Sequence, residues 1–334
     1  MKFSLIVCTF MRPKPLLDLL ESVKNQTQYP SEIIIVDGST DEKTKKILIE
    51  NRFNNLNYFL VDKDLRGLTK QRNFGVAQTA VDSEVVCFLD DDTILEPFYF
   101  EEILNAFDLD KSIVGVGGVA INENFWKKKN QFVQYNSKLY YEFEDYVYPE
   151  GSRNIIRNYL HLQSNSQPGK MPNFSHGKTC GFPLNDKVYE VDLLIGMSFS
   201  FKKSIFDYIR FSSFFEGYGL YEDADFSIRA QKFGKNVITT KAHLSHFHNP
   251  SGRPNQYRYG KMVVRNGWYV WRVKYPFPPR KAILKWHAVT LVLMFIRFIN
   301  VFTTNKRKES FTEFLGRLVG WFSLFLEKPQ LPKE

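Results

Sequence analysis

The sequence predicts an α/β fold in which a mostly parallel β-sheet is flanked by helices. The main observation is that the first 120 residues alternate between apolar runs of strand length and segments with helical periodicity. The second is the composition: the 334 residues are 43% hydrophobic and 24% charged, an ordinary balance for a globular protein with a sizeable core. Strands that alternate with helices imply a parallel sheet covered on both faces.

The elements of this first region follow one another as strand and helix in turn. Each expected strand is an apolar run, and each expected helix repeats its apolar residues three or four positions apart. The expected strands are 3–10, 32–40, 55–62, 83–90 and 112–120, and the expected helices are 13–26, 41–53, 68–80 and 96–107. In such sheets, ligands bind beyond the carboxyl ends of the strands.

The rest of the chain is less regular and suggests further divisions. Residues 121–190 are rich in Tyr, Asn and Lys, and we expect loops and short elements there. Strand-like and helix-like patterns resume at 191–209, a helix over 221–234 is stopped by Gly234, and a strand from 236 leads into a His-rich loop. We therefore divide the chain into three regions, which are 1–120, 121–253 and 254–334.

The C-terminal region, 254–334, is predicted to be helical and amphipathic. It contains a strongly apolar segment at 287–302, but the uncharged stretch between Lys285 and Arg297 is shorter than the roughly 20 apolar residues of an ordinary membrane span. A second segment repeats apolar residues on one helical face from 311 to 325, with basic residues nearby. Two such helices can lie in a membrane interface; the alternative is a helical hairpin packed on the protein's own body.

Charge and cysteine content narrow the classes of partner and compartment. A net charge of +9 suits an anionic partner, such as an anionic membrane surface. The most distinctive clusters are nevertheless acidic, whereas a nucleic-acid groove interleaves basic and aromatic residues, so we expect no nucleic acid partner. Three scattered cysteines fit neither a disulfide framework nor a Cys-rich zinc site. The apolar start is too short for a signal peptide, which predicts a cytoplasmic protein at the inner face of the cell membrane.

Three consecutive acids, Asp90, Asp91 and Asp92, end the strand at 83–90. A solvated turn before a helix explains one such residue, but not three. Clustered carboxylates at a strand end provide the oxygen ligands that Mg²⁺ or Mn²⁺ requires, and the charge of the ion offsets their repulsion. An ion held by few carboxylates keeps positions open for substrate phosphates. The triplet therefore predicts a divalent cation site.

Asp37 and Asp62 also follow strands at the same predicted edge of the sheet. The sequence DGST at Asp37 suits a plain turn, but a carboxylate at a cleft can accept hydrogen bonds from a nucleobase or a ribose. A Rossmann dinucleotide site does not fit, because the first strand leads into TFMRPKP and lacks the Gly-X-Gly-X-X-Gly loop. A plain turn and a ligand-facing carboxylate therefore both stay open for Asp37.

Six segments in this order resemble glycosyltransferase family two, whose members have the GT-A fold. They are SLIVCTFMRP, IIIVDGSTD, GLTKQRNFG, VVCFLDDD, GMSFSFKKSIF and GYGLYEDADFSIRAQKFG. The resemblance covers about residues 1–253. It implies a Rossmann-like GT-A sheet, with a nucleotide-sugar-binding half at 1–120 and an acceptor-binding and catalytic half at 121–253.

The resemblance implies a set of donor-binding residues near the start of the chain. Thr9 and Arg12 follow the first strand, where the family lines the nucleotide pocket. Asp37 matches the carboxylate that binds the nucleobase, which is usually uracil. Asp62 matches a further contact on the base side.

Further donor-side residues follow from the next two motifs. Arg72 and Asn73 match the Arg-Asn pair beside the nucleotide-sugar. Asp90 and Asp92 frame the Asp-X-Asp motif, which binds the ribose and the metal on the diphosphate. Asp91 shares that neighbourhood, and the triplet leaves open which two acids act.

The resemblance also implies that the motif YEDAD supplies the catalytic residue. Asp223 matches the family's catalytic base, with Glu222 beside it on the acceptor side. An acceptor hydroxyl is a weak nucleophile and needs a positioned base, although three acids at a helix start would also favour the helix dipole. Gly196, in GMSFS, matches a small-residue strand near the acceptor, where glycine permits close backbone approach.

The segment HLSHFHNPSGR follows the last predicted strand. In related enzymes a histidine in this place completes the metal site, and His246 is the first candidate and His248 the second. A spacing of two residues places both rings on one side of an extended segment. Arg253 is a candidate for a phosphate contact on the acceptor side, although it equally suits an exposed surface.

Together, the resemblance implies metal-dependent, inverting transfer of a sugar from a nucleoside-diphosphate-sugar, usually UDP-linked. The acceptor would be a lipid-linked or polysaccharide hydroxyl in cell-surface glycan synthesis. Two alternatives stay open. A nucleotidyltransferase would need a phosphate-cradling loop after the first strand, where 11–15 is a poor one. An inactive relative would bind nucleotide-sugar without transferring it.

Overall fold

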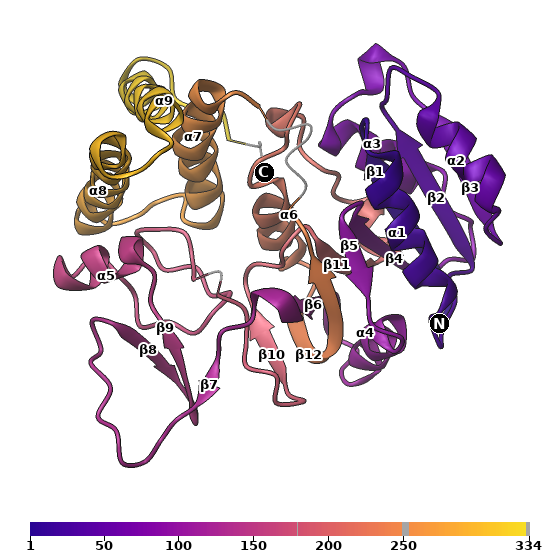
Figure 1. The fold of residues 1–334 in the computed structure, drawn as a ribbon, viewed down its shortest axis with the longest axis horizontal. Coiled ribbons are helices and arrows are strands. Elements are labelled where there is room, and N and C mark those ends of the chain that lie inside the picture. The colour runs from indigo at the N-terminus through magenta and orange to yellow at the C-terminus, as the bar shows by residue number, and fades with distance from the viewer. Residues whose placement is uncertain (179, 249–253, 332–334) are drawn as a thin grey trace. The chain divides into compact units, whose positions relative to one another are not determined.

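The computed structural model describes residues 1–178, 180–248 and 254–331 (Figure 1). The chain divides into two compact units. The first consists of Met1–Asn124 and Leu184–Arg253, and the second of Phe125–Pro183 and Pro254–Glu334. These units are defined by compactness and not by function, so the predicted functional regions 1–120, 121–253 and 254–334 stay a prediction.

The first unit is built on one mixed sheet. Its strands are β1 (Phe3–Thr9), β2 (Glu32–Asp37), β3 (Leu56–Leu60), β4 (Val85–Asp90), β5 (Thr93–Leu95), β6 (Ile113–Ala120), β10 (Val188–Val191), β11 (Ser198–Lys202) and β12 (Lys235–His246). Among the described residues the order is β10-β12-β6-β11-β4-β1-β2-β3, with β5 paired to β12. Strands β1 to β4 are mutually parallel and β6 is parallel to β12, whereas β11 runs antiparallel between β4 and β6.

Helices cover both faces of this sheet. They are α1 (Pro13–Lys24), α2 (Lys43–Asn51), α3 (Leu68–Ala77), α4 (Tyr99–Asp108) and α6 (Glu222–Ala230), and short 3₁₀ helices include η1 (Lys63–Leu65), η2 (Ile121–Glu123), η3 (Lys203–Asp207) and η4 (Ser213–Phe215). Alternate residues of β1 point to opposite faces. Phe3 packs its ring 4.9 Å from that of Phe100 on α4, whereas Ile6 lies against Gly75 of α3. The α/β fold with a mostly parallel sheet flanked by helices is confirmed.

The second unit combines a small sheet with helices. Its elements are β7 (Lys127–Lys128), β8 (Tyr140–Phe143), β9 (Tyr146–Pro149), α5 (Ser152–Tyr159), α7 (Gln256–Lys274), α8 (Arg280–Thr303) and α9 (Arg307–Leu326). The predicted C-terminal helices are therefore present. Helices α7 and α9 touch through their backbones, since a Cβ on Gly316 would lie 2.0 Å from the carbonyl oxygen of Tyr257.

A buried ion cluster joins α8 to α9. The carboxylate of Glu313 is 2.7 Å from Nη2 of Arg317 on the same helix and 3.0 Å from Nε of Arg297 on α8. Both helices leave apolar side chains exposed on their other faces. By length and composition, α8 is the one helix in the described part of the chain that could cross a membrane.

Candidate active site

The first unit gathers polar side chains at one edge of its sheet. The parallel strands β1, β2, β4, β6 and β12 all point their carboxyl ends toward this edge, because parallel strands share their direction. Asp37 ends β2, Asp90 ends β4 and His246 ends β12. Asp37, Asp90 and His246 thus lie along the same edge of the sheet, although they are distant in the sequence.

Strand β5 explains how the acidic triplet meets the histidines. It begins directly after Asp92 and pairs antiparallel with the end of β12, so that Thr93 lies opposite His246. As a result, Nε2 of His246 is 3.4 Å from Oδ1 of Asp92. Ligand atoms of Asp90, Asp92 and His246 lie within 4.8 Å of one another. Two carboxylates and an imidazole suit Mn²⁺ or Mg²⁺, so these residues fit the predicted divalent cation.

The middle acid of the triplet points elsewhere. Asp91 is buried, accepting a 2.6 Å hydrogen bond from Oγ1 of Thr9 and lying 2.9 Å from Nη1 of Arg12. Burial raises the pKa of Asp91 to about 6, although Arg12 and Thr9 oppose that rise. The turn after β1 is therefore fixed by Asp91, Thr9 and Arg12. The other two acids, Asp90 and Asp92, lie with His246 in the candidate cation site.

Asp37 is fully buried and held from both sides. Its Oδ1 accepts the backbone N–H of Ser39 at 2.8 Å, and its Oδ2 accepts the hydroxyl of Tyr58 at 2.9 Å. Tyr58, on β3, has a raised pKa because of burial and its bond to Asp37, and it therefore stays a protonated donor. This arrangement orients the carboxylate at the strand end; its contact with a nucleobase stays a prediction.

Two of the predicted donor-side residues bind the chain itself. The exposed Asp62 accepts the backbone N–H groups of Asp64 and Leu65 at 3.1 and 3.2 Å and so caps η1. Asn73 exchanges two 2.9 Å hydrogen bonds with the backbone of Phe211. These contacts fix local loops, and a further role of either residue toward a donor stays a prediction.

Arg72 contacts both the acidic triplet, through Asp90, and the segments that carry Gly196 and Glu222. The guanidinium is buried, lies 4.7 Å from the ring of Phe199, and forms an ion pair with Glu222. Its Nη2 donates to the carbonyl oxygen of Gly196 at 3.2 Å and lies 3.4 Å from Oδ1 of Asp90. Burial raises the pKa of Glu222, against the opposing effect of Arg72. A side chain so fully engaged is suited to positioning the groups around it.

Asp223 lies at the start of α6 and is held by two backbone N–H groups. Its Oδ2 accepts from Gly196 at 2.9 Å and its Oδ1 from Ala224 at 2.8 Å. Burial raises the pKa of Asp223 above the ordinary range. A side chain at 196 would crowd the site, because a Cβ there would lie 3.2 Å from Oε1 of Glu222 and 3.3 Å from Cβ of Asp223.

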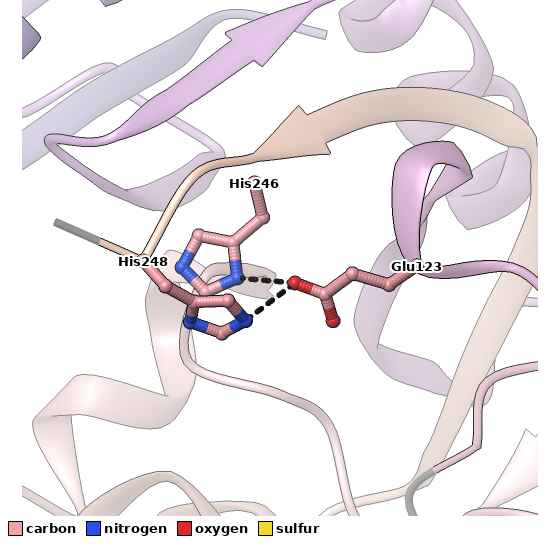
Figure 2. Close-up of side chains that lie close together, drawn as sticks. All are labelled: Glu123, His246 and His248. Carbon is pink, nitrogen blue, oxygen red and sulfur yellow. Dashed lines mark ion pairs between the residues drawn. The ribbon is translucent and has the colours of Figure 1, made fainter. Parts of the chain in front are cut away.

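Sequence reasoning missed Glu123, which Figure 2 shows beside both candidate histidines. Its Oε1 lies 3.3 Å from Nδ1 of His246 and 2.6 Å from Nε2 of His248. Burial lowers the pKa of His246, but its bonds to Asp92 and Glu123 outweigh that effect and raise the pKa to about 9. The available signal was that Glu123 follows a predicted strand that points to the same edge. Arg253 lies outside the described residues.

Comparisons with known proteins find similarity to part of the sequence and to the fold. The family model described as "Glycosyl transferase family 2" matches residues 4–161. The glucosyl-dolichyl phosphate glucuronosyltransferase of Haloferax volcanii is 28% identical over 137 residues, which cover 40% of this chain and 42% of that relative. The match thus spans less than half of the relative's own length.

Two solved structures show the same fold at low identity. GalNAc-T7 with UDP, GalNAc and Mn²⁺ has a TM-score of 0.52 at 16% identity, over 79% of this chain and 47% of that chain. The mannosyltransferase PcManGT of Pyrobaculum calidifontis, with GDP-Man and Mn²⁺, has a TM-score of 0.53 at 12% identity, over 98% of this chain and 87% of that chain. Residues 4–161, a little under half of the chain, are therefore similar to glycosyl transferase family 2, and the chain has the GT-A fold of these solved structures.

Proposed function

We propose that the chain is a glycosyltransferase of family 2, which moves a sugar from a nucleoside-diphosphate-sugar, with UDP as the expected nucleotide, to a hydroxyl of a lipid-linked or polysaccharide acceptor in cell-surface glycan synthesis. The observation that carries the proposal is the pair of contacts made by Arg72. Its guanidinium contacts Asp90, in the candidate cation site, and the carbonyl oxygen of Gly196. The N–H of Gly196 in turn donates to Asp223. A donor side and a base side are thereby held in a fixed relation, as transfer between two substrates requires.

On the donor side, we propose that Asp37 receives the nucleobase and that Thr9 and Arg12 line the nucleotide pocket through the turn they hold with Asp91. Asp92 and His246, with Asp90, would hold Mn²⁺ or Mg²⁺. When bound, such an ion supplies positive charge that offsets the charge on the departing diphosphate. Both solved structures contain Mn²⁺, which supports this choice.

On the acceptor side, we propose that Asp223 accepts the proton of the attacking hydroxyl. Each carboxylate oxygen has two lone pairs, so the single hydrogen bonds from Gly196 and Ala224 leave capacity for a substrate proton. The hydroxyl oxygen then attacks the anomeric carbon from the face opposite the leaving diphosphate, which inverts the configuration. Glu222 is paired with Arg72 and serves as a positioning residue. The name of the Haloferax relative supports a lipid-linked acceptor.

A thermal-shift panel tests the donor side. The protein is heated with UDP, GDP or dTDP, each with and without Mn²⁺, and a ligand at 100 times its Kd stabilises the folded state by about 2.7 kcal/mol. We expect a shift for UDP that requires Mn²⁺. No shift with any nucleotide, with or without the ion, would contradict the proposal.

Asp223→Asn tests the base and separates transfer from binding. We expect transfer from the donor to be lost while the nucleotide shift is retained, because the amide cannot accept the proton. Asp108→Asn, an exposed acid at the end of α4, is the matched control and should change neither. Full transfer by Asp223→Asn would refute this residue as the base. A product in which the nucleotide remains attached would identify a nucleotidyltransferase.

We also propose that α8 and α9 bind the anionic inner surface of the cell membrane. Each helix exposes an apolar stripe at helical spacing, formed by Leu284, Leu291, Phe295, Ile299 and Phe302 on α8 and by Phe311, Val319, Phe322 and Leu326 on α9. Basic residues lie at the start of α8 and again at 306–308, between the helices. Apolar stripes with cationic flanks favour an anionic lipid interface.

Sedimentation with lipid vesicles tests this surface. Phe295→Ser with Phe322→Ser should weaken binding to vesicles containing anionic phosphatidylglycerol by more than about tenfold, since each buried Phe contributes about 1.5–3 kcal/mol. Phe132→Ser, which is 97% exposed in the loop between β7 and β8, is the control. Equal binding of all variants would contradict the proposal. Wild-type protein that resists alkaline extraction would instead indicate that α8 crosses the bilayer.

A further inference from the structure

A second cluster of metal-binding side chains lies beside the proposed donor-cation site and shares one residue with it. Ligand atoms of Glu123, His246 and His248 lie within 4.8 Å of one another (Figure 2). We propose that these three residues form a separate site for a transition metal such as Zn²⁺, and that this metal competes with the donor cation for His246. Only the competition rests on the proposed function; the site itself does not.

The ligand separations are close to those of a zinc site. Tetrahedral Zn²⁺ with bonds of about 2.0–2.1 Å places its ligand atoms about 3.4 Å apart. Oε1 of Glu123 and Nδ1 of His246 are already 3.3 Å apart, and Nε2 of His248, at 2.6 Å from the same oxygen, needs to withdraw only slightly. Because the side chain of His248 is 56% exposed, it has room to make that change.

Glu123 directs one oxygen at both imidazoles. Its Oε1 is sealed from solvent and forms ion pairs with Nδ1 of His246 and Nε2 of His248, although neither contact has the geometry of a hydrogen bond. A cation placed between the oxygen and the two nitrogens would satisfy all three groups.

The backbone holds this arrangement in place. Asn122, next to Glu123, donates through Nδ2 to the carbonyl oxygen of His246 at 2.7 Å and accepts the N–H of His246 at 3.0 Å. Helix η2, which directly follows β6, and the end of β12 are therefore joined at the segments that carry Glu123 and His246. The site is built into the sheet edge and does not depend on a chance contact of long side chains.

Ligand chemistry separates this site from the neighbouring one. Two imidazoles and a carboxylate favour Zn²⁺, whereas the two carboxylates and one imidazole of Asp90, Asp92 and His246 favour Mn²⁺ or Mg²⁺. His246 turns Nε2 to Asp92 and Nδ1 to Glu123. A neutral imidazole has one lone pair, so His246 can serve one cation at a time. Zn²⁺ held at Glu123 would withdraw His246 from the donor cation.

Calorimetric titration with Zn²⁺ alone tests the site. The variants are Glu123→Gln, His248→Ala, Asp92→Asn and the control His161→Ala, an exposed histidine of the second unit. We expect Glu123→Gln and His248→Ala to lose at least about tenfold in Zn²⁺ affinity, the loss that even an outer-shell partner produces. Asp92→Asn and His161→Ala should bind Zn²⁺ as the wild type does. Wild-type affinity in Glu123→Gln, or loss of binding in Asp92→Asn, would overturn the proposal.

The competition has its own readout. Zn²⁺ should reduce the Mn²⁺-dependent thermal shift with UDP, excess Mn²⁺ should restore it, and Glu123→Gln should keep the shift while resisting Zn²⁺. If Zn²⁺ leaves the wild-type shift unchanged, the competition is refuted. If no nucleotide binds with any ion while Zn²⁺ affinity still depends on Glu123 and His248, the donor proposal fails and the zinc site stands.

Discussion

Replacing Arg72 with Met should destabilise the protein by an amount that depends on pH. The substitution removes the cation but leaves Glu222, which is 4% exposed, buried without its ionic partner. Breaking a buried ion pair from one side costs about 3–5 kcal/mol. One kcal/mol shifts the unfolding temperature of a domain of 150–250 residues by about 2–4 °C, so we expect a fall of about 6–20 °C.

The sign of the pH dependence follows from Glu222. Burial already raises its pKa with Arg72 present, and removing the guanidinium raises the pKa further. A carboxyl with a folded-state pKa above the unfolded value of about 4.3 destabilises the protein as pH rises from that value through the folded pKa. The loss in Arg72→Met should therefore be larger at pH 8 than at pH 5.5.

Unfolding of four proteins at these two pH values is the assay. They are the wild type, Arg72→Met, Glu222→Gln and the double variant. Because Gln removes the buried charge, the double variant should recover part of the stability lost in Arg72→Met at pH 8, and less of it at pH 5.5. Equal stability of Arg72→Met and the double variant at pH 8 would refute an uncompensated Glu222 as the cause.

Three further predictions concern the same site. Gly196→Ala should lower kcat by at least about tenfold through small displacements of Glu222 and Asp223, whereas Gly151→Ala, where a Cβ meets nothing within 4 Å, should leave kcat unchanged. Burial raises the pKa of Asp223, so the acid limb of kcat/KM should lie above the ordinary value of about 3.9; a limb at or below that value would contradict Asp223 as the base. Removal of divalent cations with EDTA should abolish the UDP-dependent shift while moving the unfolding temperature of the free protein by less than about 2 °C, since 1 kcal/mol corresponds to about 2–4 °C.

Local periodicity was sufficient to predict much of the fold. Each strand and helix expected over the first 120 residues is present, because each is a local pattern of apolar residues. The pairing of two strands that shape the site could not be predicted from the sequence. Strand β5 has only three residues, and β11 lies antiparallel between two parallel pairs. Their partners are distant in the chain, and periodicity carries no information about pairing.

In the candidate site, too, features within one short segment could be predicted, whereas contacts between distant segments could not. The acidic triplet was visible because three like charges in succession are costly and need a cause. Glu123 was not, since a lone acid in an irregular stretch resembles any surface residue. Glu123 can be recognised as a site residue only from the contact between η2 and the end of β12, where Asn122 bonds the backbone of His246. The orientation of the Asp91 side chain likewise depends on Thr9, at the end of β1, and on Arg12, in the turn that follows β1.

The repulsion within the triplet is offset by cationic side chains of the protein itself. Arg72 lies 3.4 Å from Asp90, Arg12 lies 2.9 Å from Asp91 and 3.5 Å from Asp92, and His246 lies 3.4 Å from Asp92. The first two cations are guanidiniums, which cannot leave or lose their charge. The third is an imidazole, which can exchange its proton for a metal ion. The acids can therefore stay together without an ion, and the imidazole beside Asp92 is a compensating charge that a metal ion can replace. Under the proposed function, the sheet edge would fold first and bind a divalent cation with its nucleotide afterwards.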